Sequence, residues 1–158
     1  MNKKRLSLLS VVAAAAALAV GVVTPADGSP AGAANQHTIH FKGVLTESAF
    51  FDLGASGPSL GDQIVFSEKL LTGQREIGHE GAVCTTVSLV RSESECTSTF
   101  SFPNGQITVQ GIFILGSMVP YAVPITGGSG AYRGAEGELR VTPVSATEGL
   151  QTLVLSDD

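Results

Sequence analysis

Basic residues and histidines are scarce in this sequence, and their scarcity argues against two classes of function. The 158 residues include 9 Lys and Arg against 14 Asp and Glu, giving a formal net charge of −5. Nucleic-acid binding needs a basic face, so this balance argues against it. The three histidines, His37, His40 and His79, lack the spacing of a zinc or iron site. We therefore expect no nucleic-acid partner, no bound metal and no other cofactor.

Long helices and nucleotide-binding patterns are also missing. After residue 34, no segment has the periodicity of a long amphipathic helix. The glycine-rich run at 127–130 does not open a helix, so it does not indicate a phosphate-binding loop. No nucleophile-elbow pattern marks a serine hydrolase. These absences leave an all-β domain as the expected class.

Apolar and β-branched runs recur along the chain, separated by Gly, Pro, Asn or Ser, and this spacing is typical of a sandwich or barrel. Joined by short connections, such strands can close as an eight-stranded antiparallel up-and-down β-barrel. The longest irregular stretch is 49–59, and Pro103-Asn104-Gly105 has the composition of a tight turn. The predicted strands are 37–47, 62–71, 80–90, 95–102, 106–115, 119–126, 132–142 and 148–156.

The first 34 residues have the pattern of a secretory signal peptide. Lys3, Lys4 and Arg5 precede an apolar run at 6–23, and small residues follow at 31–34. The alternative is a membrane anchor, but the run is near the lower limit for a span. We expect a secreted domain at 35–158, with 6 Lys and Arg against 13 Asp and Glu. That net charge of −7 argues against binding to an anionic membrane surface after the leader is cleaved.

Cys84 and Cys96 form an even cysteine count in a chain predicted to be exported, which favours a disulfide. The polar run 91–94 is the expected hairpin turn, and a turn centred there pairs Cys84 with a residue near Phe102. A disulfide needs Cα atoms within about 7 Å, so it requires a register centred near Val90 or a bulge. Two free thiols, with Cys84 inside the barrel, are the alternative.

Glu68 is the unusual residue on a predicted inner face. Ile64, Phe66, Glu68 and Leu70 alternate on one face of their strand, and a small barrel either fills its interior or holds one ligand there. A carboxylate on an apolar face is costly unless it is paired or protonated. Glu68 is therefore a candidate acid with a raised pKa, or a carboxylate that stabilises a cation. In the plainer alternative, it faces solvent or pairs with Lys69 or a neighbouring arginine.

Several short motifs follow one another along the chain: Leu60-Gly61-Asp62, Phe66 with Lys69-Leu70, Gly81 with Cys84, and Val109-Gln110-Gly111. Their order is similar to that of the allene oxide cyclase and dirigent barrels. The glycines between 127 and 137 complete the resemblance, and we expect those at 127, 128 and 130 to form a tight connection. The resemblance covers about residues 60–142. It implies an eight-stranded barrel, often trimeric, whose cyclases bind an unsaturated fatty-acid epoxide and steer its ring closure.

The resemblance also implies site residues, with departures. Cys84 matches a lumenal cysteine of the family, Phe113 stands where plant cyclases have a tyrosine, and Glu68 stands where they have a water-holding asparagine. Glu47 is the nearest candidate for the family's glutamate. The candidate catalytic residues are thus Glu68 and Glu47, and the candidate ligand-binding residues are Phe66, Cys84 and Phe113.

These observations lead to three hypotheses of function. The first is a secreted barrel that binds a small apolar molecule in its lumen and steers its cyclisation or coupling, with the homotrimer that the family resemblance implies. The second is a non-catalytic carrier that uses the same lumen. The third is a structural or interaction barrel whose core is filled by side chains. Alternation alone does not separate them, because lumen volume depends on rotamers and strand shear.

Overall fold

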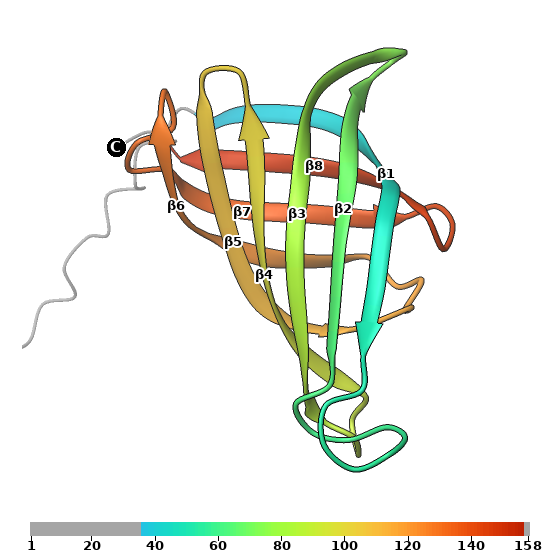
Figure 1. Ribbon diagram of the computed structural model, residues 1–158. Helices are drawn as coiled ribbons and strands as arrows, with labels where there is room; N and C mark the ends of the chain where they lie inside the picture. The colour runs from blue at the N-terminus through green and yellow to red at the C-terminus, as the bar shows by residue number, and fades with distance from the viewer. Residues whose placement is uncertain (1–35, 157–158) are drawn as a thin grey trace, which may run out of the picture. The chain divides into compact units, whose positions relative to one another are not determined.

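The computed structural model describes residues 36–156, and these form one closed antiparallel barrel in which the strands are neighbours in chain order (Figure 1). The predicted leader lies outside the described residues. Within residues 36–156, no helix is long and apolar enough to cross a membrane. The strands are β1 (Gln36–Phe51), β2 (Gln63–Thr72), β3 (Arg75–Ser88), β4 (Glu93–Phe102), β5 (Gly105–Ile114), β6 (Tyr121–Gly130), β7 (Glu136–Pro143) and β8 (Glu148–Ser156).

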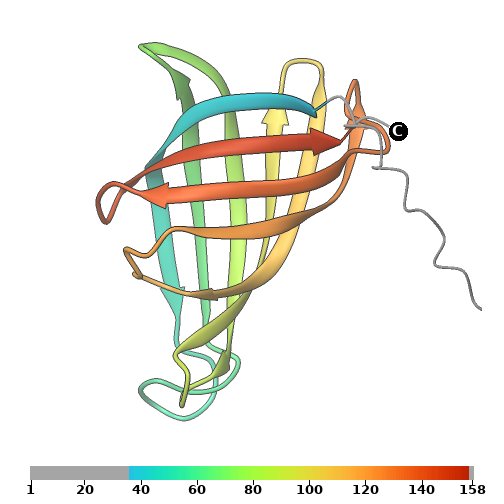
Figure 2. The same ribbon diagram turned by 180° about the vertical axis from the view of Figure 1, so that it is seen from behind.

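Strand β1 closes the barrel because it bends and pairs with two neighbouring strands, β8 and β2. Its first part, from Gln36 to Val44, pairs with β8, and the part from Lys42 to Phe51 pairs with β2. Figures 1 and 2 show the result: the start of β1 runs with β8 across the barrel, and its end turns to run along β2. Gly43 lies where the two ladders overlap. The bend therefore brings side chains of β2 and β8 together across β1.

The eight-stranded barrel is confirmed, whereas several predicted boundaries were wrong. Strand β1 continues to Phe51, so the irregular segment begins later than expected. The glycines at 127–130 belong to β6, and the turn follows them at 131–134. Only Gly127 and Gly130 of that group have positive φ. Gly137 has φ of 124°, and a Cβ there would lie 2.0 Å from the carbonyl oxygen of Val154. That position in β7 therefore excludes any side chain.

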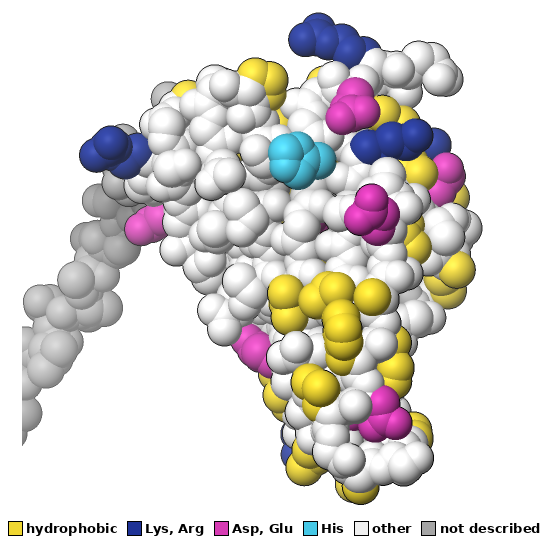
Figure 3. All heavy atoms as spheres, viewed as in Figure 1, with side chains coloured by type: hydrophobic (Ala, Val, Ile, Leu, Met, Phe, Trp, Pro, Cys, Tyr) yellow, Lys and Arg dark blue, Asp and Glu magenta, His cyan; other side chains and the backbone are white. Residues whose placement is uncertain are grey.

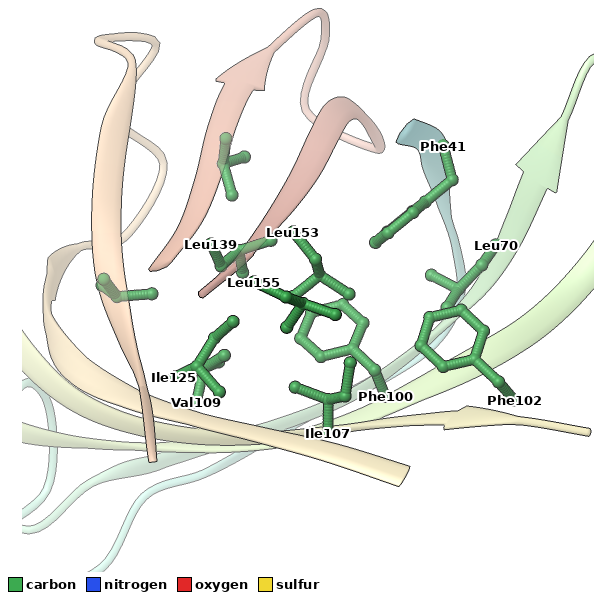
Figure 4. Packing of buried hydrophobic residues seen from close by; sticks show 12 residues of the cluster. Phe41, Leu70, Phe100, Phe102, Ile107, Val109, Ile125, Leu139, Leu153 and Leu155 are labelled. Atoms are coloured by element: carbon green, nitrogen blue, oxygen red, sulfur yellow. The ribbon is translucent and has the colours of Figure 1, made fainter. Parts of the chain in front are cut away.

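A cluster of apolar side chains fills one end of the barrel interior (Figure 4). Phe41 packs against both Phe100 and Phe102, with ring centroids 5.8 and 6.1 Å apart. Leu70, Ile107 and Leu153 complete the packing and are fully buried. A ligand can therefore occupy only the other end of the lumen, which these side chains do not fill.

Cys84 and Cys96 form a disulfide, and the hairpin turn expected at 91–94 was wrong. Strand β4 already begins at Glu93, so the turn consists of residues 89–92, where Ser92 takes a positive φ of 56°. Cys84 and Cys96 are direct cross-strand partners with Cα atoms 4.0 Å apart. A bulge between Thr86 and Ser88 absorbs the remaining offset. The required register near Val90 is therefore the one that forms.

Asp62 fixes the loop between β1 and β2 at the end of the barrel opposite the filled core. Its carboxylate accepts hydrogen bonds from the backbone N–H of Ser59 at 2.7 Å and of Leu53 at 3.0 Å. The Ser59 hydroxyl donates a third, at 2.8 Å. The backbone hydrogen bond from Ser59 is the largest of the effects that lower the pKa of Asp62. The prediction that this residue accepts local backbone hydrogen bonds is confirmed.

Candidate functional site

Two glutamates face each other inside the barrel, on neighbouring strands. Glu68 of β2 is the cross-strand partner of Glu80 of β3, and the same row continues through Phe100 of β4 and Ile107 of β5. Phe100 and Ile107 belong to the filled core. The carboxyl pair therefore lies at the boundary between the packed core and the open part of the lumen.

Gln151 of β8 reaches this carboxyl pair from the other side of β1. Its side-chain Nε2 donates a hydrogen bond of 2.9 Å to Oε2 of Glu68. The bond passes over Gly43, where a Cβ would lie 2.0 Å from Glu68 Oε2 and 2.3 Å from Gln151 Nε2. The side-chain carbonyl Oε1 of Gln151 is buried and has no hydrogen-bond partner among the described residues. One acceptor in this site is thus left without a donor.

Burial raises the pKa of both glutamates. Glu80 is only 5% exposed, and its desolvation, together with the negative charge of Glu68, raises its pKa to about 8. A hydrogen bond from Ser98 lowers this pKa but does not offset the rise. Burial also raises the pKa of Glu68, while the hydrogen bond from Gln151 opposes the rise. Two like charges this close disfavour double ionisation. At pH 7 the pair consequently holds a proton that we assign mainly to Glu80.

Tyr121 of β6 completes the polar group around this proton. Burial and the charges of Glu80 and Glu68 raise the pKa of its phenol to about 12, so it stays a neutral donor at physiological pH. Its ring meets that of Phe113 edge to face, with centroids 4.9 Å apart. The protonated Glu80 and the phenol of Tyr121 therefore lie beside the aromatic ring of Phe113. Such an arrangement is suited to general acid catalysis on an apolar molecule.

The open part of the lumen consists of two adjoining cavities. The inner one has a volume of about 70 Å³ and reaches Glu80, Ser98 and the disulfide. The outer one has a volume of about 380 Å³ and opens between the segments that follow β5 and β7. Small-molecule pockets usually measure about 300–1,000 Å³. The two share Phe66, Glu68, Phe113, Tyr121 and Gln151 among their lining residues.

Four of the five predicted site residues lie together in this lumen. Phe66, Glu68 and Phe113 line both cavities, and Cys84 lines the inner one as part of the disulfide. Glu68 hydrogen-bonds Gln151 in place of the alternative partner Lys69. Among residues 36–156, no group of His, Cys, Asp or Glu has the arrangement of a metal site.

Glu47 does not join the other candidate residues. It is exposed and absent from the lining of both cavities, whereas its neighbour Ser48 lines the outer one. The bulge between Leu45 and Glu47 shifts the alternation of β1 by one residue. Odd-numbered residues such as Leu45 point into the barrel before the bulge, and even-numbered residues such as Ser48 do so after it. Sequence alternation counted through the bulge cannot detect this change.

Glu80, Tyr121 and Gln151 are functional candidates that sequence reasoning missed. Glu80 carries only a partial signal: the hairpin turn at Gly73 and Gln74 alone would place His79 opposite Glu68, and the bulge between Leu70 and Leu71 moves Glu80 into that position. Gln151 carries no such signal, because it reaches Glu68 only through the bend of β1.

Adding one methyl group at Gly43 tests the bridge between Glu68 and Gln151. The atoms that it would displace are the ends of two flexible side chains, so we expect Gly43→Ala to fold. The 2.9 Å hydrogen bond should break, which leaves buried polar groups unsatisfied and costs about 1–3 kcal/mol of unfolding free energy. Denaturant unfolding measures this loss, and an unchanged free energy would contradict the bridge's role. Gly81→Ala, where a Cβ meets nothing within 4 Å, is the matched control.

Comparison with known proteins agrees with this architecture. The family model described as "Allene oxide cyclase barrel like domain" matches residues 42–155. No curated protein is significantly similar in sequence to this chain. A solved structure named pyocyanin demethylase is 26% identical, covers 75% of this chain and 99% of its own, and has a TM-score of 0.66.

Two more distant structures share the fold. A Diels-Alderase from Streptomyces koyangensis is 13% identical over 81% of this chain and 71% of its own, with a TM-score of 0.63. A pterocarpan synthase dirigent protein is 17% identical over 78% of this chain and 96% of its own, with a TM-score of 0.61. The match of the family model to most of the chain decides the classification. This chain belongs to the allene oxide cyclase barrel-like family.

Proposed function

We propose that this protein is a secreted barrel that binds one small, mostly apolar molecule in its lumen and steers a ring closure of that molecule. The observation that carries the proposal is the carboxyl pair of Glu68 and Glu80 at the inner end of an apolar cavity. A cavity of about 380 Å³ argues against a structural barrel with a filled core. The disulfide supports secretion, because such bonds persist in oxidising compartments.

In the proposed reaction, protonated Glu80 is the general acid. Its proton activates an oxygen of the bound molecule, such as that of an epoxide, and the C–O bond opens as positive charge develops on carbon. The carboxylate of Glu68 stabilises that charge, and ring closure returns a proton from the product to Glu80. Phe66 and Phe113 restrict the conformations that the apolar body adopts, which decides the stereochemistry.

The relatives support a small-molecule function without naming the substrate. The 26% identical structure is a pyocyanin demethylase by name, and the more distant ones include a Diels-Alderase and a dirigent protein. The polar end of this lumen is not suited to an anion, because Glu68 and Glu80 would repel a carboxylate. We therefore favour a neutral or cationic substrate over a free fatty acid.

Homotrimer formation is part of the proposal, by family resemblance. Ala49, Val65 and Val83 are cross-strand partners in one row of β1, β2 and β3, and Val83 is 44% exposed. Apolar side chains gather over this face of the barrel in Figure 3. Exposed apolar patches of this kind mark interaction surfaces, and a second copy of the chain fits the resemblance.

Chiral product analysis tests the steering function. The full chain is mixed with the methyl ester of a short-lived unsaturated fatty-acid epoxide, whose ester removes the repelled carboxylate. We expect the enantiomeric excess to be largely lost in Glu80→Gln and Glu68→Gln, because loss of a general acid slows the steered ring closure about 10²-fold or more and the spontaneous racemic closure then dominates. Glu47→Gln is the matched control and should keep the excess, because Glu47 lies outside the cavities.

The other results separate the remaining hypotheses. A racemic product identical to that formed in buffer overturns steering of this reaction. Retention of a small molecule through purification, together with a racemic product, favours the non-catalytic carrier. An excess lost only in Glu47→Gln would return the acid role to the residue that the family resemblance suggested.

A further inference from the structure

We propose that the lumen selects an apolar organic cation, a protonated amine, and places its ammonium group between Glu68, Glu80 and the side-chain carbonyl of Gln151. This inference rests on the proposed function, since it uses the same lumen and names the class of molecule bound there. The preference for a cation can be tested separately from ligand binding, because a lumen could bind and cyclise a neutral molecule with no preference for charge.

The first support is the charge of the walls. Three glutamates, Glu68, Glu80 and Glu148, line the two cavities, and no Lys, Arg or His is among their lining residues. Glu148 lies at the outer cavity and is paired with Lys42 at 3.2 Å. The uncompensated acid groups are therefore those at the inner end. A buried acid pair without a basic partner is the complement of a cationic ligand.

The second support is an unpaired hydrogen-bond acceptor. Gln151 donates through Nε2 to Glu68 and also hydrogen-bonds Glu80, whereas its acceptor Oε1 is buried and unpaired among the described residues. Gln151 is 6% exposed, so bulk water does not readily serve this atom. Buried acceptors are almost always satisfied, and a primary ammonium brings three N–H donors to a site rich in carboxyl and amide oxygens.

The third support is the shape of the site and its aromatic wall. The inner cavity of about 70 Å³ has room for a small head group, and the outer cavity of about 380 Å³ has room for an apolar body. Phe66, Phe113 and Tyr121 line both spaces. Aromatic faces attract cations, most strongly where water is excluded. An amine on an aromatic or alicyclic body matches both parts.

Binding of such a cation should release a proton. The groups that act on Glu80 are Glu68 from β2, Ser98 from β4, Tyr121 from β6 and Gln151 from β8, and none of them is basic. Burial holds the pKa of Glu80 at about 8, so this carboxyl is mostly protonated at pH 7. A neighbouring ammonium favours the ionised form and lowers this pKa. The proton then leaves to solvent as the ammonium arrives, so Glu80 is a carboxylate in the complex with a cation, and the acid step proposed above applies to a neutral substrate.

Calorimetric titration with three matched probes tests the inference. The probes are 1-naphthylmethylamine, 1-naphthalenemethanol and 1-naphthoate, which share the naphthalene ring system and are cationic, neutral and anionic at pH 7. We expect the amine to bind about tenfold or more tightly than the alcohol at pH 7, from charge-assisted hydrogen bonds and cation–π attraction. The anion should bind most weakly. Titration in two buffers of different ionisation enthalpy should reveal release of up to one proton with the amine alone.

Three variants locate the preference. Glu80→Gln mimics the protonated acid and should bind the amine without proton release, and Glu68→Gln should lose most of the preference for the amine. Glu47→Gln should behave as the wild type. Circular dichroism and intact disulfides establish that each variant is folded. Equal affinity for alcohol and amine, or a preference for the anion, overturns the cation site while leaving a ligand-binding lumen. Binding of none of the probes overturns both this inference and the proposed lumenal function.

Discussion

Replacing Glu80 by glutamine is expected to stabilise the barrel at pH 8 and to flatten the dependence of its stability on pH. The pKa of Glu80 is about 8 in the folded protein against 4.5 as the ordinary value. Between these values the folded state binds more protons than the unfolded state, so the free energy of unfolding of the wild type falls as pH rises. Full stability is present below about pH 4.5, and the loss is complete above about pH 8.

The expected size of this effect is on the order of a few kcal/mol, since each unit of pKa shift corresponds to about 1.4 kcal/mol. Glutamine keeps the shape of the protonated acid and has no charge to desolvate. The variant and the wild type should therefore be similar near pH 5 and diverge steadily toward pH 8. The raised pKa of Glu68 adds a fall of the same sign in the wild type, and removal of the Glu80 charge should reduce it.

Urea unfolding at pH 5, 6, 7 and 8, with the disulfide intact, measures the divergence. Glu47→Gln is the control, because its side chain is exposed and should leave the curve unchanged. A wild type that gains stability between pH 5 and 8 would contradict the buried, protonated state of Glu80. So would a Glu80→Gln variant that is destabilised equally at every pH.

Removal of the disulfide is the change with the second large effect. The bond joins adjacent strands and closes a segment with a sequence separation of 12 residues. A crosslink of this length contributes about 2–4 kcal/mol, mainly by restricting the unfolded chain. Cys84 and Cys96 are also 1% and 4% exposed and line the inner cavity. We expect Cys84→Ala with Cys96→Ala to lose that stability and to enlarge the inner cavity.

Guanidinium unfolding with and without reductant separates the two contributions. Reductant should lower the unfolding midpoint of the wild type toward that of the double variant and leave the double variant unchanged. The remaining gap between the reduced wild type and the double variant measures the packing of the two sulfur atoms. A wild type whose midpoint does not respond to reductant would show that the crosslink adds no stability.

The sequence predicts the barrel because its signals are local. Alternation, tight turns such as that at 103–105 and the spacing of apolar runs are all readable within ten residues, and these elements formed. The errors fall where one residue of offset matters. The disulfide depended on whether residues 93 and 94 belong to the turn or to β4, and polarity alone favoured the turn. Ser94 is only 4% exposed because it lies within β4, and the polarity of its side chain does not reveal this burial.

The candidate site was only partly predictable for a similar reason. Glu68 was recognisable because an acid interrupts an apolar inner face, and the structure brings it to the cavity. Its significance depends on Glu80 and Gln151, which come from two other strands. Gln151 meets Glu68 because β1 bends at Gly43, and no local pattern encodes a contact across 83 residues of sequence.

Strand β6 divides its pairing between its two neighbours, and this division gives the barrel a seam. Gly130 to Ile125 pair with β5, and Tyr121 to Pro124 pair with β7. The last residues of β5, from Gln110 to Ile114, consequently have no ladder on that side within residues 36–156. Phe113 and Tyr121 of the outer cavity lie along this seam. No ladder hydrogen bond has to break at this seam, so a shift of the side chains that pack across it, such as Val123 over Gly111, would admit a bulky ligand from the side while the rest of the wall stays closed.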